Sequence, residues 1–288
     1  MYQRSLQWYQ NGLANRARYC QLYESAIRAM ARMLTYVRGF TFPERAIGGW
    51  WWIWRWRFEA LMGWYEPELV GFCRHCIRAG DIVLDIGGNI GLHSRAFSRL
   101  VGPTGRVIVF EPNPENVSVL RRNLAAKKYR NVEIVWAAAG DSSGMATLHV
   151  SPGHSNHSLV AGYTEATEQI EVPLVELDSF LEQRGIQRVN FIKTDTEGAD
   201  FLVLRGLKRT LQKLDHVSMV IEYNPVAMKL AGFAPGGLAQ LLQSYGFLVR
   251  AIRPDWSTAD PADLDEKEHA NLLCGKPGGA AGDYSSLN

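Results

Sequence analysis

The spacing of apolar residues changes near residue 80. Upstream, apolar positions between residues 6 and 37 recur at steps of three and four, which predicts helix over residues 1–38. Downstream of a helix expected at 65–78, short apolar runs alternate with stretches of helical period. The runs predict strands at 82–86, 106–110, 132–138, 146–150, 171–176, 189–193, 217–222, 247–253 and 270–275. The stretches between them predict helices at 92–100, 114–127, 200–212 and 236–245.

This alternation predicts an α/β fold, an open and mostly parallel sheet with helices on both faces. Ligands of such sheets bind at the carboxyl ends of the strands, so we expect the chemistry in residues that directly follow a strand. The change of pattern also predicts three parts. They are a helical N-terminal segment over 1–64, a body over 65–276 and a polar tail over 277–288 that we expect to be disordered.

Composition narrows the classes of protein to consider. Of 288 residues, 47% are hydrophobic and 21% are charged, with 31 Lys and Arg against 29 Asp and Glu. This near balance argues against a dedicated nucleic-acid binder. No run of about 18 apolar residues is present to span a membrane, and the first ten residues lack the apolar core of a signal peptide. With only four Cys, we expect a cytoplasmic protein without a disulfide framework.

The tryptophans are unevenly distributed, since seven of the nine lie in the first 64 residues. Residues 1–80 also contain eleven Arg and five Glu but no Lys or Asp, so this end of the chain is basic. Aromatic residues interleaved with Arg are typical of an interfacial belt. One alternative is therefore a non-catalytic adaptor that contacts a membrane surface or a partner. In an enzyme, we expect residues 48–64 to cover the acceptor side of the site or to dock a substrate carrier.

The first chemical motif is a glycine loop after the strand expected at 82–86. Glycines let backbone amides approach a ligand closely, and the start of the next helix favours an anionic group. The G-x-x-x-G spacing suits the amino-acid portion of S-adenosylmethionine, whose ammonium Asp85 would take. The spacing lacks the third glycine of a dinucleotide site, which weighs against the alternative of a NAD-dependent oxidoreductase. The predicted cofactor residues here are Asp85, Gly87, Gly88, Asn89 and Gly91.

Acidic and small residues follow the next two strands. An acid after the strand at 106–110 is placed to accept hydrogen bonds from both hydroxyls of a ribose. Small side chains at 137–141, after the third strand, leave room for a flat adenine. The cofactor contacts predicted from these two strand ends are Glu111, Pro112, Asn113, Ala138 and Asp141.

The fourth motif brings three ionisable residues to the same edge of the sheet. Lys193, Asp195 and Glu197 are spaced two residues apart, which puts their side chains on one face. A base at this place would help an acceptor alcohol lose its proton, at a typical gain of about 10²–10⁴-fold. The residues leave the base open between Asp195 and Glu197, with His154 or His157 of a polar loop as a rival.

Two further groups have weaker signals. Cys73 and Cys76 have metal-like spacing, but they lie in a predicted helix and no second pair accompanies them. We therefore expect buried thiols and no metal site. Residues 222–224 end another strand at the same edge, where a substrate contact and a hydrogen-bonded strand end are equally plausible.

Together these stretches resemble the FkbM family of S-adenosylmethionine-dependent methyltransferases. The resemblance covers about residues 66–276, and its most specific part is 192–198 with 203–206 after it. Gly88, Thr196 and Asp200 depart from the family's usual residues. The resemblance implies a Rossmann-like sheet of seven strands, mostly parallel with the last strand antiparallel. It carries cofactor binding over to Asp85, Gly87, Asn89, Gly91 and Glu111.

The resemblance also implies methyl transfer, most often to a hydroxyl of a sugar or a secondary metabolite in natural-product biosynthesis. Some relatives methylate the side-chain nitrogen of a peptide, and this alternative stays open. The expected partner is accordingly a small-molecule, glycan or peptide acceptor rather than nucleic acid. Asp195 and Glu197 are implied to lie nearest the methyl group, and Lys193 and His157 complete the catalytic candidates.

Overall fold

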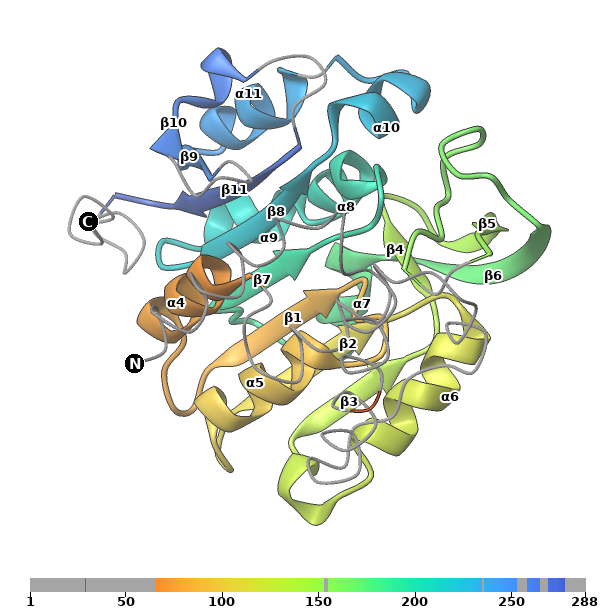
Figure 1. Cartoon of the computed structure of the whole chain (residues 1–288). Coiled ribbons are helices and arrows are strands. Elements are labelled where there is room, and N and C mark those ends of the chain that lie inside the picture. Colours follow the sequence, from red (N-terminus) through yellow and green to blue (C-terminus); the bar gives the residue numbers. More distant parts are fainter. Residues whose placement is uncertain are drawn as a thin grey trace. The chain divides into compact units, whose positions relative to one another are not determined.

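The main sheet of the part of the chain that the structure describes is mixed and has eight strands (Figure 1). The computed structural model describes residues 66–152, 155–234, 236–252, 258–264 and 269–277, together with residue 29. The predicted helical, Trp-rich segment over 1–64 and nearly all of the predicted tail lie outside these residues. Among the described residues, no helix combines the length and the apolar character needed to cross a membrane.

The strand order confirms the predicted mostly parallel sheet. The order is β10-β9-β11-β8-β7-β1-β2-β3, and β11 pairs antiparallel with both of its neighbours. The strands from β8 to β3 are all parallel. A two-residue β10 adds an eighth, antiparallel strand that the pattern did not predict. The bounds are β1 Ile82–Ile86, β2 Arg106–Phe110, β3 Val132–Val135, β7 Phe191–Thr194, β8 Ser218–Tyr223, β9 Leu248–Ile252, β10 Thr258–Ala259 and β11 Ala270–Gly275.

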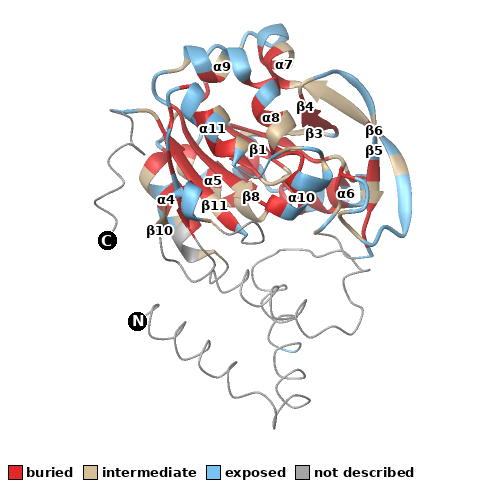
Figure 2. Cartoon of the chain, turned by 90° about the horizontal axis from the view of Figure 1, so that it is seen from above, coloured by how far each residue is buried: buried red, intermediate tan, exposed pale blue. Residues whose placement is uncertain are grey.

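Alternate residues of the central strands build two core layers, one on each face of the sheet. Val83 of β1 packs on one face, with Phe97 and Phe191 among its cluster. Leu84 packs on the other face, in a cluster that includes Phe110. Because both faces are covered, these strands are continuous apolar runs rather than alternating ones. Figure 2 shows the buried strands in the middle and exposed residues on the outer sides of the helices.

The helices expected between the strands are present with some differences: α7 and α10 were not predicted, and the helix expected over 114–127 ends at Asn123. The helix expected over 200–212 is two helices, α8 and α9, which are separated at Leu207. α5 packs against β1 and β2, and α11 packs against β9. The bounds are α4 Pro67–Cys76, α5 Leu92–Val101, α6 Pro114–Asn123, α7 Leu177–Gln183, α8 Asp200–Gly206, α9 Lys208–Lys213, α10 Pro225–Leu230 and α11 Gly237–Ser244.

A small second sheet corrects the expectation for the middle of the chain. The strand expected at 132–138 ends at Val135, and β4 (Ala138–Gly140) belongs to a three-stranded sheet of order β4-β6-β5. Its other strands are β5 (Gly144–Val150) and β6 (Glu168–Glu176), which pair antiparallel. β4 lies against α8 of the main fold. This sheet supports the loop that reaches the candidate site.

The contact between α8 and β4 depends on Gly206. A Cβ atom at this position would lie 1.9 Å from the carbonyl oxygen of Gly140. We expect Gly206→Ala to lower the free energy of unfolding by about 1–3 kcal/mol through overpacking. Gly71→Ala is the matched control, because that exposed helical site has no atom within 4 Å of the added Cβ. It should gain about 0.5–1 kcal/mol. Chemical denaturation followed by circular dichroism measures both, and equal midpoints would contradict the assignment.

Candidate active site

The carboxyl ends of β1, β7 and β8 bring the predicted chemical residues together. These strands are adjacent and parallel, so the residues after Ile86, Thr194 and Tyr223 meet at one edge. The amide of Asp195 donates to the carbonyl oxygen of Ile86 at 3.1 Å. A Cβ atom on Gly87 would lie 1.9 Å from the Asp195 carbonyl oxygen, so only glycine allows this approach. The glycine loop and the acidic loop are thus in direct contact.

The glycine loop has the backbone that the sequence motif requires. Gly87 and Gly91 have φ angles of 78° and 88°, and Asn89 between them has a φ of 48°. These values lie in the left-handed region, which side chains other than those of Gly, Asn and Asp rarely adopt. A Cβ atom on Gly88 would lie 2.1 Å from Val109. The four predicted loop residues therefore form a tight turn that exposes backbone rather than side chains.

Asp85 has one carboxylate oxygen available for a ligand. The residue is fully buried, and its Oδ2 accepts a hydrogen bond from Ser94 Oγ at 2.5 Å. Its Oδ1 is buried and has no hydrogen-bond partner among the described residues. A buried, unpaired acceptor is costly, and a ligand ammonium would satisfy it. The site therefore fits the amino-acid portion of S-adenosylmethionine.

Glu111 is buried and already organised by backbone amides. Its two oxygens accept from the amides of Asn89 at 2.8 Å and Asn113 at 2.9 Å. Burial raises the pKa of Glu111 to about 7, and these hydrogen bonds act in the opposite direction. Asn113 also caps α6 with its side chain, and the carbonyl of Pro112 accepts from Trp136 Nε1 at 2.9 Å. All three predicted residues thus lie beside the glycine loop.

The other two predicted cofactor residues, Ala138 and Asp141, make contacts within the protein. Ala138 is buried in β4, where it packs in the core of the small sheet. Asp141 makes an ion pair with Arg205 at 3.0 Å. A role in holding adenine stays a prediction for both residues.

At the edge of the sheet, Asp195 interacts with both Lys193 and Glu222. The Lys193 ammonium is buried and lies 2.8 Å from Asp195 Oδ2. Partial burial acts to raise the pKa of Asp195, but Lys193 and a hydrogen bond with Glu222 outweigh it and hold the pKa below its usual value. Burial and the charges of the neighbouring carboxylates raise the pKa of Glu222 well above its usual value. These opposite shifts favour the ionised form of Asp195 and the protonated form of Glu222.

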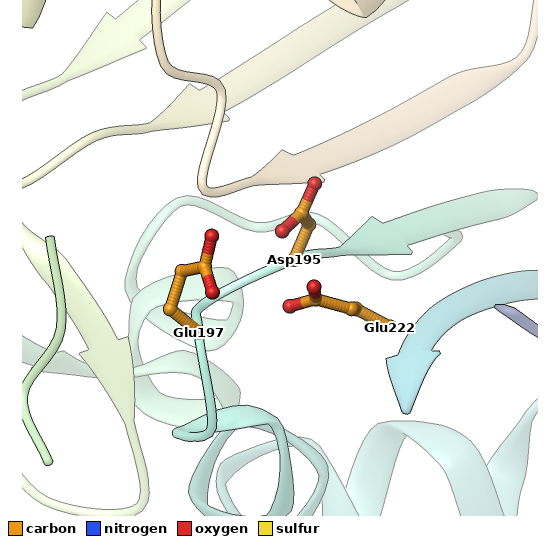
Figure 3. Close-up of side chains that lie close together, drawn as sticks. All are labelled: Asp195, Glu197 and Glu222. Atoms are coloured by element: carbon orange, nitrogen blue, oxygen red, sulfur yellow. The ribbon is translucent and has the colours of Figure 1, made fainter. Parts of the chain in front are cut away.

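Glu197 completes the cluster of three carboxylates that Figure 3 shows. Its backbone has a φ of 53°, which turns the chain back toward the site. Burial, then the charge of Asp195, raises the pKa of Glu197 to about 8. One carboxylate oxygen from each of Asp195, Glu197 and Glu222 lies within 4.8 Å of the others. Oxygen atoms so arranged could also hold a divalent cation, although no metal site was expected from the motifs of this chain.

The two histidine candidates have different outcomes. His157 is largely turned into its own loop, where Nδ1 accepts from the amide of Ser151 at 3.2 Å. Burial lowers the pKa of His157 to about 4, so it is neutral at physiological pH. His154 lies outside the described residues. A role of His157 as base stays a prediction, and Glu197 has the more suitable pKa.

Two residues that sequence reasoning did not identify contact Glu197. Tyr163 Oη donates to Glu197 Oε2 at 2.7 Å, and Ser158 Oγ donates to the Glu197 carbonyl oxygen at 2.7 Å. Both lie in the irregular stretch between β5 and β6, which has no motif and no periodic pattern. Asn224, named only as part of a strand end, donates to Tyr163 Oη at 2.7 Å.

Comparison with known proteins identifies the family of this chain. The profile described as "Methyltransferase FkbM domain" matches residues 85–249. Methyltransferase 1 of Beauveria bassiana is 30% identical over 203 residues, covering 62% of this chain and 77% of the relative. The 31-O-demethyl-FK506 methyltransferase FkbM of Streptomyces tacrolimicus is 27% identical over 212 residues, covering 62% and 78%. The hexuronic acid methyltransferase AglP of Haloferax volcanii is 26% identical over 188 residues, covering 65% and 71%.

The first prediction from this geometry concerns Asp85. Asp85→Asn keeps the shape of the side chain but removes the charge that would pair with a ligand ammonium. We expect the affinity for S-adenosylmethionine, measured by calorimetry, to fall about 10- to 100-fold, the usual value of a charge-assisted hydrogen bond. Glu133→Gln is the control, because Glu133 only forms ion pairs with Arg106 and Arg184 near the surface. Equal affinities of the two variants would contradict the assignment.

The second prediction concerns the pH dependence of cofactor affinity. Ribose hydroxyls would donate to ionised Glu111, so binding lowers its pKa from about 7 and releases a proton. Affinity should rise by up to about tenfold per pH unit below this pKa and level off above it. Glu111→Gln should remove this component of the pH dependence, while titration of the ligand itself appears in both proteins. A variant with an unchanged profile would show that Glu111 does not meet the cofactor.

Proposed function

This chain belongs to the FkbM family of methyltransferases, and from this premise we propose that it methylates a hydroxyl group of a sugar or a secondary metabolite. It is a methyltransferase whose methyl donor is S-adenosylmethionine. Bound S-adenosylmethionine supplies an electrophilic methyl group. The identity of the acceptor is the part that we propose, and the acidic cluster carries the argument.

The observation that favours a hydroxyl is the Glu197 carboxyl group beside the cofactor loop. An alcohol is a weak acid and must lose its proton as its oxygen becomes bonded to carbon. A general base is most effective when its pKa is close to the working pH. The pKa of Glu197 is raised to about 8, whereas that of Asp195 lies below its usual value. Glu197 is therefore the better proton acceptor of the two.

The other two carboxyl groups have supporting roles in this proposal. Asp195 stays ionised because Lys193 lies 2.8 Å away, so it can accept a hydrogen bond that orients the acceptor. Glu222 holds a proton and shares it with Asp195. The acceptor proton then passes to the ionised Glu197 carboxylate as the methyl group bonds to the acceptor oxygen, and this lowers the negative charge of the cluster by one. Catalysis otherwise rests on placement of the acceptor.

The names of several relatives also support an oxygen acceptor. One relative is a 31-O-demethyl-FK506 methyltransferase and another is a hexuronic acid methyltransferase. A third, from Sinorhizobium fredii, is the 2-O-methyltransferase NoeI, which is 28% identical over 147 residues. Two of these names specify methylation of an oxygen and one specifies a sugar acid, in keeping with the class of acceptor that we propose.

The test uses the full chain with S-adenosylmethionine and a panel of methyl glycosides, hydroxylated macrolides and peptides that contain Asn or Gln. Mass spectrometry should find the added methyl group on a hydroxyl. Glu197→Gln should then lower kcat about 10²- to 10⁴-fold, the usual contribution of a general base. Its affinity for S-adenosylmethionine should not change. Glu171→Gln, which removes an exposed carboxylate of β6, is the matched control and should keep full turnover.

Two outcomes would contradict the proposal. Methylated amide nitrogen with no methylated hydroxyl would favour the peptide alternative. Full turnover of Glu197→Gln would remove Glu197 as the base. Each assay is repeated after treatment with a chelator and after addition of Mg²⁺, so that a requirement for a cation at the carboxylates is detected separately.

A further inference from the structure

The stretch between β5 and β6 reaches back from the small sheet to the acidic cluster. Ser158 is tied to the end of β5, because its backbone exchanges two hydrogen bonds with His149, at 2.8 and 3.2 Å. Its side chain is buried and donates from Oγ to the carbonyl oxygen of Glu197. The same Oγ accepts from the amide of Val160 at 2.9 Å. This stretch therefore holds the backbone of Glu197 in its left-handed conformation.

Tyr163 of the same stretch holds the Glu197 side chain. Its hydroxyl lies 2.7 Å from Glu197 Oε2 and 2.7 Å from Asn224 Nδ2. An amide NH₂ group can only donate, so the Tyr163 oxygen accepts from Asn224, and its own proton remains for donation to Glu197. Asn224 is buried, and its Oδ1 accepts from the amide of Ala227 at the start of α10. Asn224, which is held by the start of α10, thus orients the Tyr163 hydroxyl toward Glu197.

The charged groups around Glu197 make this donor important. Lys193, Asp195 and Asp200 face it from the end of β7 and the start of α8, and Glu222 faces it from β8. Three of these four groups are carboxyls, which disfavour a further negative charge on Glu197. Among the described residues, the hydroxyl of Tyr163 donates a hydrogen bond to the Glu197 carboxylate. It stabilises the ionised form at a fixed position.

We propose that Tyr163, oriented by Asn224, is a positioning residue that holds the Glu197 carboxylate in place to receive the acceptor proton. This inference rests on the proposed function, because it gives Glu197 that task. It extends the site beyond the strand ends to the stretch between β5 and β6. Two hydrogen bonds from this stretch thus hold Glu197. Ser158 holds its backbone and Tyr163 holds its carboxylate.

The test is Tyr163→Phe in the full chain, assayed with the acceptor that the panel identifies. We expect kcat to fall about tenfold, the usual effect of losing one hydrogen bond to a charged group, while KM for the acceptor and the affinity for S-adenosylmethionine stay the same. Tyr129→Phe is the matched control. It also removes a buried hydroxyl with two partners, Arg95 at 2.9 Å and Arg99 at 3.1 Å, but it lies outside the cluster. Its kcat should stay the same.

A double-mutant cycle separates positioning from general loss of structure. In the Glu197→Gln background, Tyr163→Phe should lower kcat little further, because its effect passes through Glu197. An equal loss in both backgrounds would overturn the proposal. Asn224→Ser, which keeps an acceptor for the helix cap but removes the amide donor, is the second variant. It should lower kcat in the same direction, and an unchanged kcat would also count against the proposal.

A spectroscopic measurement needs no acceptor. Carbon-13 NMR of protein labelled at the Glu side-chain carboxyl groups identifies Glu197 as the signal that Glu197→Gln removes. At about pH 9, where Glu197 with its pKa of about 8 is mostly ionised, Tyr163→Phe should move this signal toward the position of a protonated carboxyl, whereas Tyr129→Phe should not. An unmoved signal would overturn the positioning role by itself. A moved signal together with full turnover of Glu197→Gln would instead remove the proposed function, and Tyr163 would then position no catalytic group.

Discussion

The close approach of Gly87 to the carbonyl of Asp195 is the constraint on which the site depends. It is made by backbone atoms alone, and a Cβ atom on Gly87 would lie 1.9 Å from the Asp195 oxygen. Because β1 and β7 are paired side by side, their two loops must pass each other at this point. One loop contains the backbone that fits the methyl donor, and the other contains the carboxylates. The distance between donor and base is therefore set by sheet geometry rather than by flexible side chains.

The second constraint is charge. Asp195, Glu197, Asp200 and Glu222 lie near one another, and Lys193 provides a single buried positive charge. Four ionised carboxylates so close together would destabilise the fold, so the cluster keeps part of its protons. A group that is partly protonated near neutral pH can accept and release a proton easily. The electrostatic cost of the cluster and its usefulness for proton transfer thus have one origin.

Sequence patterns predicted the parts of the fold that local periodicity controls. The central strands are continuous apolar runs, so Asp85 near the end of β1 and Glu111 directly after β2 could be placed from the strand pattern alone. The break of the strand expected at 132–138 could not be seen, because β3 pairs with β2 whereas β4 pairs with β6, and pairing between distant residues leaves no local signal. Tyr163 was missed for a similar reason. Its contact with Glu197 joins residues 34 positions apart, and Tyr163 itself lies in a stretch without regular structure.

The hydrogen bonds from Ser158 and Tyr163 have a consequence for how this protein can diverge. Irregular stretches between strands usually tolerate exchange and insertion, because few other residues depend on them. Here the stretch after β5 contacts Glu197 in the loop that follows β7 of the main sheet, so its two hydroxyls must be preserved whenever its length or composition changes. The outer residues of this stretch could change to fit new acceptors only if Ser158 and Tyr163 keep their positions relative to Glu197.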